Sequence, residues 1–566
     1  MHVRLLQLFV IFFISLSFSA PLPGVEFTSS NLPIIKIDTH GQRIPYDNPR
    51  ISADMQIIYN GAGEINRVTD PPNEYDGNID IEIRGHSSAG WAKKQYAIET
   101  QKDDGSNRNV NLFGFGGEND WVLNGPYIDK SFLRNVLAYK FSRELGQYAS
   151  RTRYCELILN GTYQGLYIFM EKIKRDDDRI DIAELDSSDT HGSDVTGGYI
   201  LKIDKIDWEQ DDGWSSQYLP LSGSSKKVFY IFHDPKHDEL VKEQKNYIHA
   251  FMDEFEQLMK SNSYADSISG YTNLIDVKSF IDYLLVNEIS KNVDGYRLST
   301  YMYKRKDTNG GKLYMGPVWD FNLAFGLADY YDAHDTDGWM VEELSVGQGI
   351  RRDNWQTPFW WMKLVQDPRF CNQLEKRWVT LRQNVFDIDR IHAYIEEVAD
   401  TLEQAKERNF ELWTGPGEKK APGDGFWPVP DVFYTFETYQ DEIDFLKDWI
   451  KKRIIWMDNN MASLSDTEQQ LSLPNNFELY ANYPNPFNTS TTIRYTIPYA
   501  GHLKVTIYDG RGRRVKTLVD DFVVPADYRI QWHGRNEAQL DVASGVYMVR
   551  VKYDNLERER KILLLR

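Results

Sequence analysis

Apolar and polar residues alternate with a period of two through much of the first hundred positions, and glycine, asparagine and proline interrupt them. This alternation is typical of short, half-buried β-strands. A further pair of apolar runs flanks Asn160-Gly161, which predicts a β-hairpin. The predicted strands comprise residues 34–37, 55–59, 79–83 and 96–100, and the hairpin comprises residues 156–159 and 165–169.

Farther along the chain the apolar residues recur every three or four positions, which predicts helices. One helix is expected to begin at Asp129-Lys130-Ser131, and others to cover residues 276–289, 369–385 and 391–412. The body, residues 27–456, is therefore predicted to be an α+β domain that is strand-rich first and helix-rich later.

The pattern changes again after Trp456. Residues 457–474 are predicted to form a linker, because they include the polar stretch 463–474. Alternating Val, Ile and Tyr then return with turns every eight to twelve residues, in strands at 491–497, 504–508 and 546–551. This spacing predicts an Ig-like β-sandwich over residues 475–566.

The amino terminus has the layout of an export signal. Arg4 precedes an apolar run over residues 5–18, and small residues follow at Ser19 and Ala20. The run is shorter than the ~20 residues that a membrane span needs, so residues 1–20 are predicted to be a signal peptide, with an uncleaved anchor as the alternative. No later stretch is apolar enough to span a bilayer, so the mature chain is expected to be secreted or at the cell surface, without a transmembrane segment.

Composition removes several classes of function. The chain has 566 residues, of which 84 are acidic and 65 basic, giving a net charge of −19. Duplex nucleic acid is therefore excluded as a partner of the whole surface. Cys155 and Cys371 are the only cysteines, which excludes a disulfide scaffold and a cysteine-rich zinc site. One bridge between them stays open, but two buried free thiols are the favoured prediction.

The most informative stretch runs from residue 288 to 326. A predicted helix ends, a polar loop carries Asp294, a hairpin spans residues 300–303 and 312–315, and Asp320 follows its second strand. Protein kinases use this order, with the first Asp at the acceptor hydroxyl and the second on the Mg²⁺ that binds the ATP phosphates. A second kinase metal ligand lies five residues after the first Asp, where this chain has Ser299. The alternative is a hairpin with turn-forming aspartates.

Basic residues upstream extend this interpretation. Arg84 ends a predicted strand before a Gly/Ser loop, and Lys93 and Lys94 begin the next strand. A lysine there could reach the α- and β-phosphates, with Glu171 as its partner. The alternative for the two lysines is a solvated pair on a strand edge.

Two other features favour ordinary structural roles. The acidic loop formed by Asp329, Asp332, Asp335 and Asp337 lacks the spacing of an EF-hand, so a solvated loop is preferred over a calcium site. The aromatic residues Trp355, Trp360 and Trp361 are predicted to pack in the core rather than to form a docking surface.

Several motifs, in order, resemble the spore-coat-protein-H (CotH) kinase family. Arg84-Gly85-His86-Ser87-Ser88, followed by Lys93-Lys94-Gln95-Tyr96, resembles the family's R-G-x-S-S…K-K-x-Y element. The resemblance implies an atypical, secreted or surface protein kinase that uses ATP and Mg²⁺ or another divalent cation. By match, Lys93 or Lys94 would contact ATP with Glu171 in support, Asp294 would be the acid/base residue and Asp320 the metal ligand. The other motifs are residues 118–123, 129–135, 159–165, 171–173, 292–296 and 319–322.

Two positions depart from the family pattern. Asn322 stands where the family has a second Asp, and Ser299 stands where it has Asn. An amide oxygen can coordinate Mg²⁺ but carries no charge, so metal affinity should be lower. The alternative function is therefore a catalytically weak or inactive kinase-fold protein that acts in surface binding or adhesion.

The tail has a resemblance of its own. Residues 483–488, 507–512 and 543–547 resemble the Ig-like, hook-capping-like C-terminal sorting domains of type IX secreted proteins. This resemblance implies contact with the secretion machinery and substrates that are themselves exported or surface proteins. The alternative is a generic β-sandwich spacer.

Overall fold

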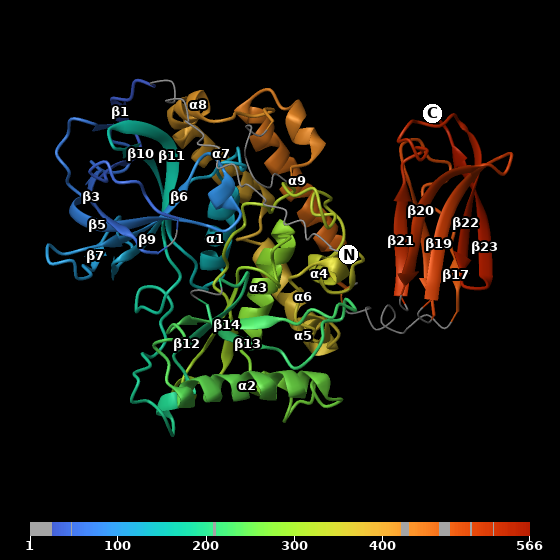
Figure 1. The fold of residues 1–566 in the computed structure, drawn as a ribbon, viewed down its shortest axis with the longest axis horizontal. Coiled ribbons are helices and arrows are strands. Elements are labelled where there is room, and N and C mark those ends of the chain that lie inside the picture. The colour runs from blue at the N-terminus through green and yellow to red at the C-terminus, as the bar shows by residue number, and fades with distance from the viewer. Residues whose placement is uncertain are drawn as a thin grey trace, which may run out of the picture.

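A computed structural model describes residues 25–46, 48–207, 211–419, 429–462, 464, 476–498, 501–523 and 526–566 (Figure 1). The predicted signal peptide lies outside these residues. The described residues form a mixed α/β body followed by a separate unit of β-strands, as the sequence predicts. Within them, no helix has the length and apolarity needed to cross a bilayer.

The first part of the body is a closed barrel in the order β10-β11-β9-β6-β5-β3-β2. Neighbouring strands are antiparallel, except that β2 closes the barrel by pairing parallel with β10, Ile34 opposite Glu156. Ile35, Met55 and Ile98 are among the apolar side chains of its core. The strands are β2 (Ile34–Asp38), β3 (Ile51–Ile58), β5 (Tyr75–Arg84), β6 (Gln95–Thr100), β9 (Asp120–Asn124), β10 (Thr152–Leu159) and β11 (Thr162–Glu171). Two short pairs flank them, β1 (Ser29–Ser30) with β4 (Asn66–Arg67) and β7 (Val110–Asn111) with β8 (Gly117–Glu118).

Helix α1 (Arg134–Glu144) connects β9 to β10 and begins five residues later than the predicted start at Asp129. The Asp129 carboxylate accepts hydrogen bonds from the backbone N–H groups of Ser131 and Arg134 and from the Arg134 guanidinium. Phe132 has φ 63°, in the left-handed region, so the chain turns once more before the helix.

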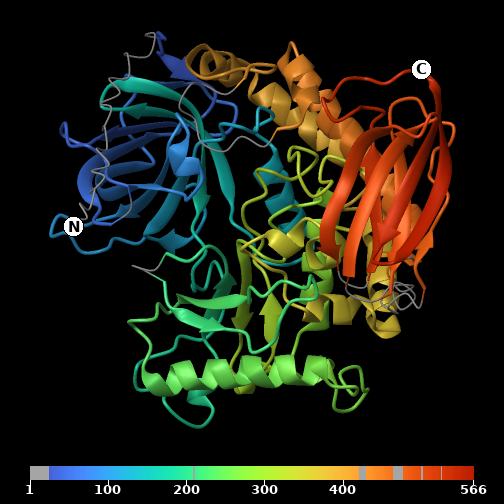
Figure 2. The same cartoon turned by 45° about the vertical axis from the view of Figure 1, so that its right-hand side comes forward.

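A second sheet follows in the order β13-β14-β12-β15-β16. It contains the hairpin predicted between residues 300 and 315, whereas its other three strands were not predicted. Figures 1 and 2 show α2 (Lys242–Lys260) lying beneath it. The strands are β12 (Tyr199–Ile203), β13 (Gly213–Ser215), β14 (Phe229–Asp234), β15 (Thr300–Lys304) and β16 (Leu313–Met315).

Helices form the rest of the body. The helix predicted over residues 391–412 is two helices that meet at Leu402, which is fully buried. The last helix continues to Asn460, into the predicted linker, because Met457 still packs in the core. The helices are α3 (Val277–Ser290), α4 (Met340–Val346), α5 (Trp360–Val365), α6 (Pro368–Arg382), α7 (Ile388–Thr401), α8 (Glu403–Leu412) and α9 (Tyr439–Asn460).

Predictions about individual core residues divide in two. Trp360 and Trp361 are fully buried, which confirms the core prediction, whereas Trp355 is only half-buried and lines a cavity. Cys155 and Cys371 are both buried and free, which confirms the favoured prediction of two free thiols.

The tail consists of two antiparallel sheets around a shared core that includes Trp532, Tyr495 and Val549. Its strands include those predicted from the alternation of Val, Ile and Tyr. One sheet contains β17 (Glu478–Leu479), β18 (Thr491–Ile497) and β21 (Ala526–Trp532), and the other contains β20 (Arg514–Val523), β19 (Gly501–Asp509), β22 (Gly545–Tyr553) and β23 (Leu556–Leu564).

Candidate active site

A cavity of about 1260 Å³ lies between one end of the barrel and the second sheet. Residues that are far apart in the sequence share its wall, with Arg84 at the end of β5 and Asp294 after α3. Asp320, which follows β16, lines it as well. The structure thus brings the two predicted aspartates to one cavity, together with Ser299 and Asn322.

Helix α1 holds the segment that carries Asp320. The backbone N–H of Asp320 donates to the Tyr139 hydroxyl at 3.2 Å, and that of Phe321 donates to Asn135 Oδ1 at 2.6 Å. Asp320 has φ 63°, a conformation that costs free energy in a residue other than glycine. Contacts from a packed helix are needed to keep the side chain in this position.

The motif at residues 129–135 therefore has a structural function at the site. Besides Asn135, it supplies Arg134, whose guanidinium is completely buried. Arg134 Nε donates to the Ala324 carbonyl at 3.1 Å, and its Nη1 contacts Asp129 at 2.5 Å. The motif fixes the segment from residue 320 to 324 against α1.

Burial dominates the electrostatics of Asp320 and raises the pKa of its carboxyl to about 7. The negative charges of Asp294 and Asp204 raise this pKa further, while Arg84 and Lys205 oppose the shift. Burial also raises the pKa of Asp294. Two carboxyls with raised pKa values at one cavity wall form the kind of arrangement found at catalytic and ligand sites.

Asp204 and Lys205, directly after β12, were not identified from the sequence. Lys205 Nζ donates to Ser87 Oγ at 2.9 Å and lies 5.2 Å from the Trp355 ring centroid, so it links the Gly/Ser loop to the opposite wall. Arg84 stacks over Trp319 at 5.5 Å. In the sequence, an Asp-Lys pair after a strand has no distinguishing signal.

The sequence predicted that Lys93 or Lys94 would lie beside the aspartates, but neither lysine lines the cavity. Lys93 is fully buried, and its Nζ donates to the Leu166 carbonyl at 2.5 Å and to Asn409 Oδ1 at 2.6 Å. Burial lowers its pKa well below the usual value for lysine. Lys94 Nζ donates to the carbonyls of Ala89 and Trp91, so it supports the Gly/Ser loop from outside the cavity.

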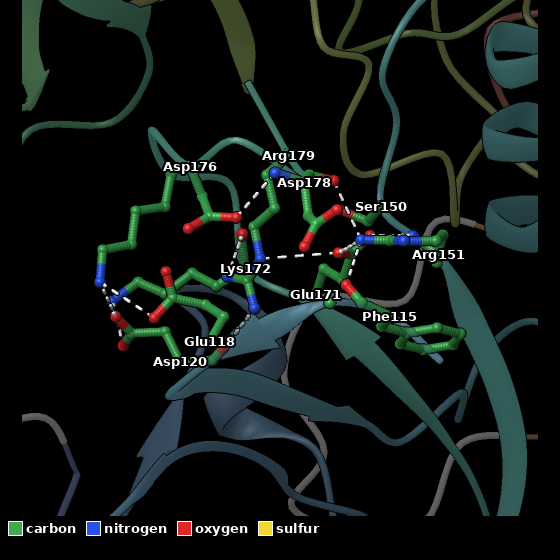
Figure 3. Close-up of polar contacts among 12 residues, drawn as sticks. Phe115, Glu118, Asp120, Ser150, Arg151, Glu171, Lys172, Asp176, Asp178 and Arg179 are labelled. Carbon is green, nitrogen blue, oxygen red and sulfur yellow. Dashed lines mark hydrogen bonds and ion pairs between the residues drawn. The ribbon is translucent and has the colours of Figure 1, made fainter. Parts of the chain in front are cut away.

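Glu171 also has partners other than those predicted. Figure 3 shows its carboxylate between two guanidinium groups, those of Arg151 and Arg179. Arg151 Nη2 lies 2.6 Å from Glu171 Oε1, and Arg179 Nε lies 3.6 Å from the same oxygen. Arg179 also donates to the carbonyls of Lys172 and Asp120, at 2.9 Å each. The three side chains fasten the segment after β11 to the barrel.

The residues next to Glu171 do reach the cavity. Lys172 and Lys174 line it and form ion pairs with Asp120 at 3.3 and 3.0 Å. Figure 3 shows Lys172 and Asp120. Burial opposes ionisation of Asp120, but the charges of Lys172 and Lys174 outweigh it and hold its pKa below the usual range. The alternation in Glu171-Lys172-Ile173-Lys174 is the signal that could have identified these two lysines.

The donor atoms fit a nucleotide with a hard divalent cation. Asp320, Asn322 and Ser299 offer oxygen ligands in one cavity. Among the described residues, no three carboxylate, imidazole or thiol groups stand close enough to form a metal site by themselves. Mg²⁺ usually takes one or two carboxylates and completes its shell with water and substrate phosphates, so the set suits it better than a calcium cage. The acidic loop at residues 329–337 forms no such group either.

Comparison with known proteins gives two matches along the chain. The family described as CotH kinase protein matches residues 81–457, and the family described as secretion system C-terminal sorting domain matches residues 481–564. Inner spore coat protein H of Bacillus subtilis (strain 168) is 22% identical over 303 residues, which cover 52% of this chain and 70% of that protein.

Two solved structures from Porphyromonas gingivalis are similar over a small part of the chain. Dimeric latent PorU is 20% identical over a match that covers 15% of this chain and 9% of the PorU chain, with a TM-score of 0.14. PorZ is described as an essential bacterial surface component of the type-IX secretion system. It is 26% identical over a match that covers 17% of this chain and 12% of the PorZ chain, with a TM-score of 0.13. The chain thus spans a small part of either protein. Because the first family match covers most of its length, the chain belongs to the CotH kinase protein family and ends in a secretion system C-terminal sorting domain.

Proposed function

We propose that the protein is a secreted kinase that transfers the γ-phosphate of ATP to hydroxyl side chains of exported or surface proteins. The observation that carries the proposal is the placement of two half-buried carboxyls with raised pKa values, Asp294 and Asp320, in one cavity beside Arg84 and Lys205. Family membership supports the same reaction class.

Each residue has a distinct role in this proposal. Asp294 would accept the proton of the acceptor hydroxyl, and Asp320 would hold the metal ion with Asn322 and Ser299 as uncharged ligands. ATP with Mg²⁺ would supply the phosphoryl group when bound. Arg84 and Lys205, rather than Lys93 and Lys94, would offset the phosphate charge.

Two substitutions separate binding from transfer. Asp320→Ala should abolish metal-dependent ATP binding in calorimetry, because it removes the charged metal ligand. Asp294→Ala should leave ATP binding intact but stop transfer of radioactive γ-phosphate to the protein itself or to an exported substrate. Asp329→Ala, an exposed carboxylate of the following loop, is the matched control and should change neither. Wild-type protein that neither binds nucleotide nor becomes labelled contradicts the proposal.

Metal binding should also depend on pH. The Asp320 carboxyl must lose its proton to hold a cation, and its pKa is about 7. Metal-dependent ATP affinity should therefore rise from pH 6 to pH 8 and then level off. In calorimetry, an affinity that falls over this interval would contradict the assignment of Asp320.

A second candidate function is surface binding or adhesion with weak or absent catalysis. The presence of Asn322 and Ser299 where the family pattern has Asp and Asn favours it. Asn322 removes one negative charge from the metal ligands, and the Ser299 hydroxyl is a weaker ligand than an amide oxygen. A thermal-shift series with ATP and Mg²⁺ discriminates the two functions. Nucleotide binding raises the unfolding midpoint by mass action, and an adhesin without a nucleotide site shows no change.

For localisation, we propose export through the signal peptide and the type IX machinery to the outside of the cell. The sorting-domain match at residues 481–564 supports this route. Removing residues 475–566 should leave the body inside a cell that has this secretion system, as measured by fractionation and immunoblotting. Secretion of the truncated chain at the normal level would contradict the proposal.

A further inference from the structure

Arg297 lies between two carboxylates in the wall of the cavity. Its Nη1 is 3.0 Å from Asp353 Oδ2, whereas its Nη2 is 3.5 Å from Asp294 Oδ1. The side chain is 2% exposed, and its Nε donates to the Val293 carbonyl at 3.0 Å. One buried cation is thus shared by two acids, and the shorter contact goes to Asp353.

Asp353 is itself held in place from two other sides. The Tyr331 hydroxyl donates to Oδ2 at 2.5 Å, and the backbone N–H of Trp355 donates to Oδ1 at 3.0 Å. The Tyr331 ring also lies against the Arg297 guanidinium, 5.2 Å from centroid to Cζ. Asp353 therefore joins three segments of the cavity wall, those carrying Arg297, Tyr331 and Trp355, and is the better anchored of the two acids.

The difference between the two contacts has a chemical consequence. A carboxylate that accepts a short, charge-assisted bond from a guanidinium is stabilised in its ionised form and becomes a weaker base. At 3.5 Å the contact with Asp294 is longer and weaker, so the charge of Arg297 lowers the pKa of Asp294 without forming a short charge-assisted bond to it. We propose that Asp353 is a positioning residue, which holds Arg297 away from Asp294 and so keeps the Asp294 carboxylate available to accept a proton. This inference rests on the proposed function, in which that proton comes from the acceptor hydroxyl.

Other charges also face Asp294, and they set what a substitution can show. Burial raises its pKa most, Arg297 and Lys205 lower it, and Asp204 and Asp353 raise it. The charge of Asp294 in turn raises the pKa values of Asp320 and Tyr330. Replacing Asp353 by asparagine removes one negative charge and frees Arg297 to approach Asp294, and both changes favour the ionised form of Asp294.

The test measures Asp294 directly and needs no ATP. Full-length protein is labelled with a carbodiimide and an amine between pH 4 and pH 8, and the label on Asp294 is quantified by peptide mass spectrometry. Asp353→Asn should move the midpoint of labelling to lower pH by about 0.5 unit or more. Asp353→Glu, which keeps the charge, and Asp329→Asn, an exposed change of the same charge, should leave it in place.

A double substitution separates positioning from simple repulsion between two acids. If Asp353 acts through Arg297, the shift caused by Asp353→Asn should largely disappear in an Arg297→Gln background. Should that background fail to fold, Arg297→Lys, which keeps the charge but not the two-pronged reach, takes its place. An absent or upward shift in Asp353→Asn, or an equal shift in both backgrounds, overturns the inference.

The kinase assay provides a second measurement. In Asp353→Asn the rate of transfer at pH 7 should fall by about two- to threefold, because Asp294 becomes a weaker base, and the acid limb of the pH profile should shift to lower pH, while the KM for ATP stays the same. A labelling shift in a protein that never transfers phosphate supports the arrangement and contradicts the proposed function. Transfer without any labelling shift supports the function and overturns the inference.

Discussion

Glu442 provides the sharpest test of the electrostatics in the body. It lies in the first turn of α9, is 1% exposed, and its Oε2 accepts no hydrogen bond from the described residues. Burial raises the pKa of this carboxyl to about 7, Asp129 adds to the shift, and Arg134 and Lys130 oppose it. Arg134 also donates to the Ala324 carbonyl in the segment after Asp320. The charge of Glu442 therefore acts on the same arginine that fixes this segment.

The sign of the effect follows from proton linkage. In the unfolded chain the carboxyl loses its proton near pH 4.5, its ordinary value, whereas in the folded protein it keeps it to about pH 7. Between these values the folded state binds more protons, so the free energy of unfolding falls by about 1.4 kcal/mol per pH unit as pH rises. Above pH 7 the wild type should bear a penalty of about 3 kcal/mol, and below pH 4.5 none.

Glu442→Gln removes the titration and keeps the shape of the side chain. Relative to wild type, its free energy of unfolding should increase by about 2–3 kcal/mol between pH 5 and pH 8. Urea unfolding followed by tryptophan fluorescence measures this difference. Glu437→Gln, the same change at an exposed position five residues earlier, should show no pH-dependent gain. A difference that does not depend on pH, or a wild type that gains on the variant as pH rises, would refute the reasoning.

Three further predictions concern packing and thiols. Arg453→Met should lower the free energy of unfolding by about 3–5 kcal/mol in urea, because it leaves the fully buried Glu288, 3.1 Å away, without its cation. Lys452→Met, which breaks an exposed pair nearby, should lower it by under about 1 kcal/mol, and equal losses would contradict the burial argument. Gly213→Ala should detach β13 and lower the thermal midpoint, since a Cβ would lie 1.8 Å from the Tyr230 carbonyl oxygen. Gly545→Ala meets no atom within 4 Å and should have little effect, and a larger loss in Gly545→Ala than in Gly213→Ala would show that the strand pairing is wrong. Burial raises the pKa of Cys371 to about 12 and that of Cys155 above its usual range, so a thiol reagent should label neither in the native protein and both after denaturation; rapid native labelling would contradict their burial.

Local patterns were sufficient to predict most strands of the barrel and the order that leads from Asp294 to Asp320. Alternation identified β5 and β6, because one face of each strand packs in the barrel core. The start of α1 could not be predicted, since the Asp129 side chain satisfies backbone donors before the helix begins. Helix spacing alone does not show such a competing local structure.

Residues that act through tertiary contacts were beyond the sequence. Lys93 and Lys94 have the charge expected of phosphate-binding residues, but the entry to β6 directs one into the core and the other to the back of a loop. Asp204 and Asp353 lie about ninety residues before and sixty residues after Asp294, and only the fold places them at the same cavity. No spacing rule connects positions on separate sheets and loops.

The parallel pairing of β2 with β10 constrains the order in which the polypeptide can mature. Strand β2 pairs with β10, which lies more than a hundred residues downstream, so the barrel cannot close until β10 has been synthesised. Until then β2 has an edge with unsatisfied amides and carbonyls, which is a template for joining another molecule. Fragments cut between the two strands should therefore aggregate rather than persist as small independent domains. Any division of the protein for expression should keep the whole barrel, residues 34–171, together.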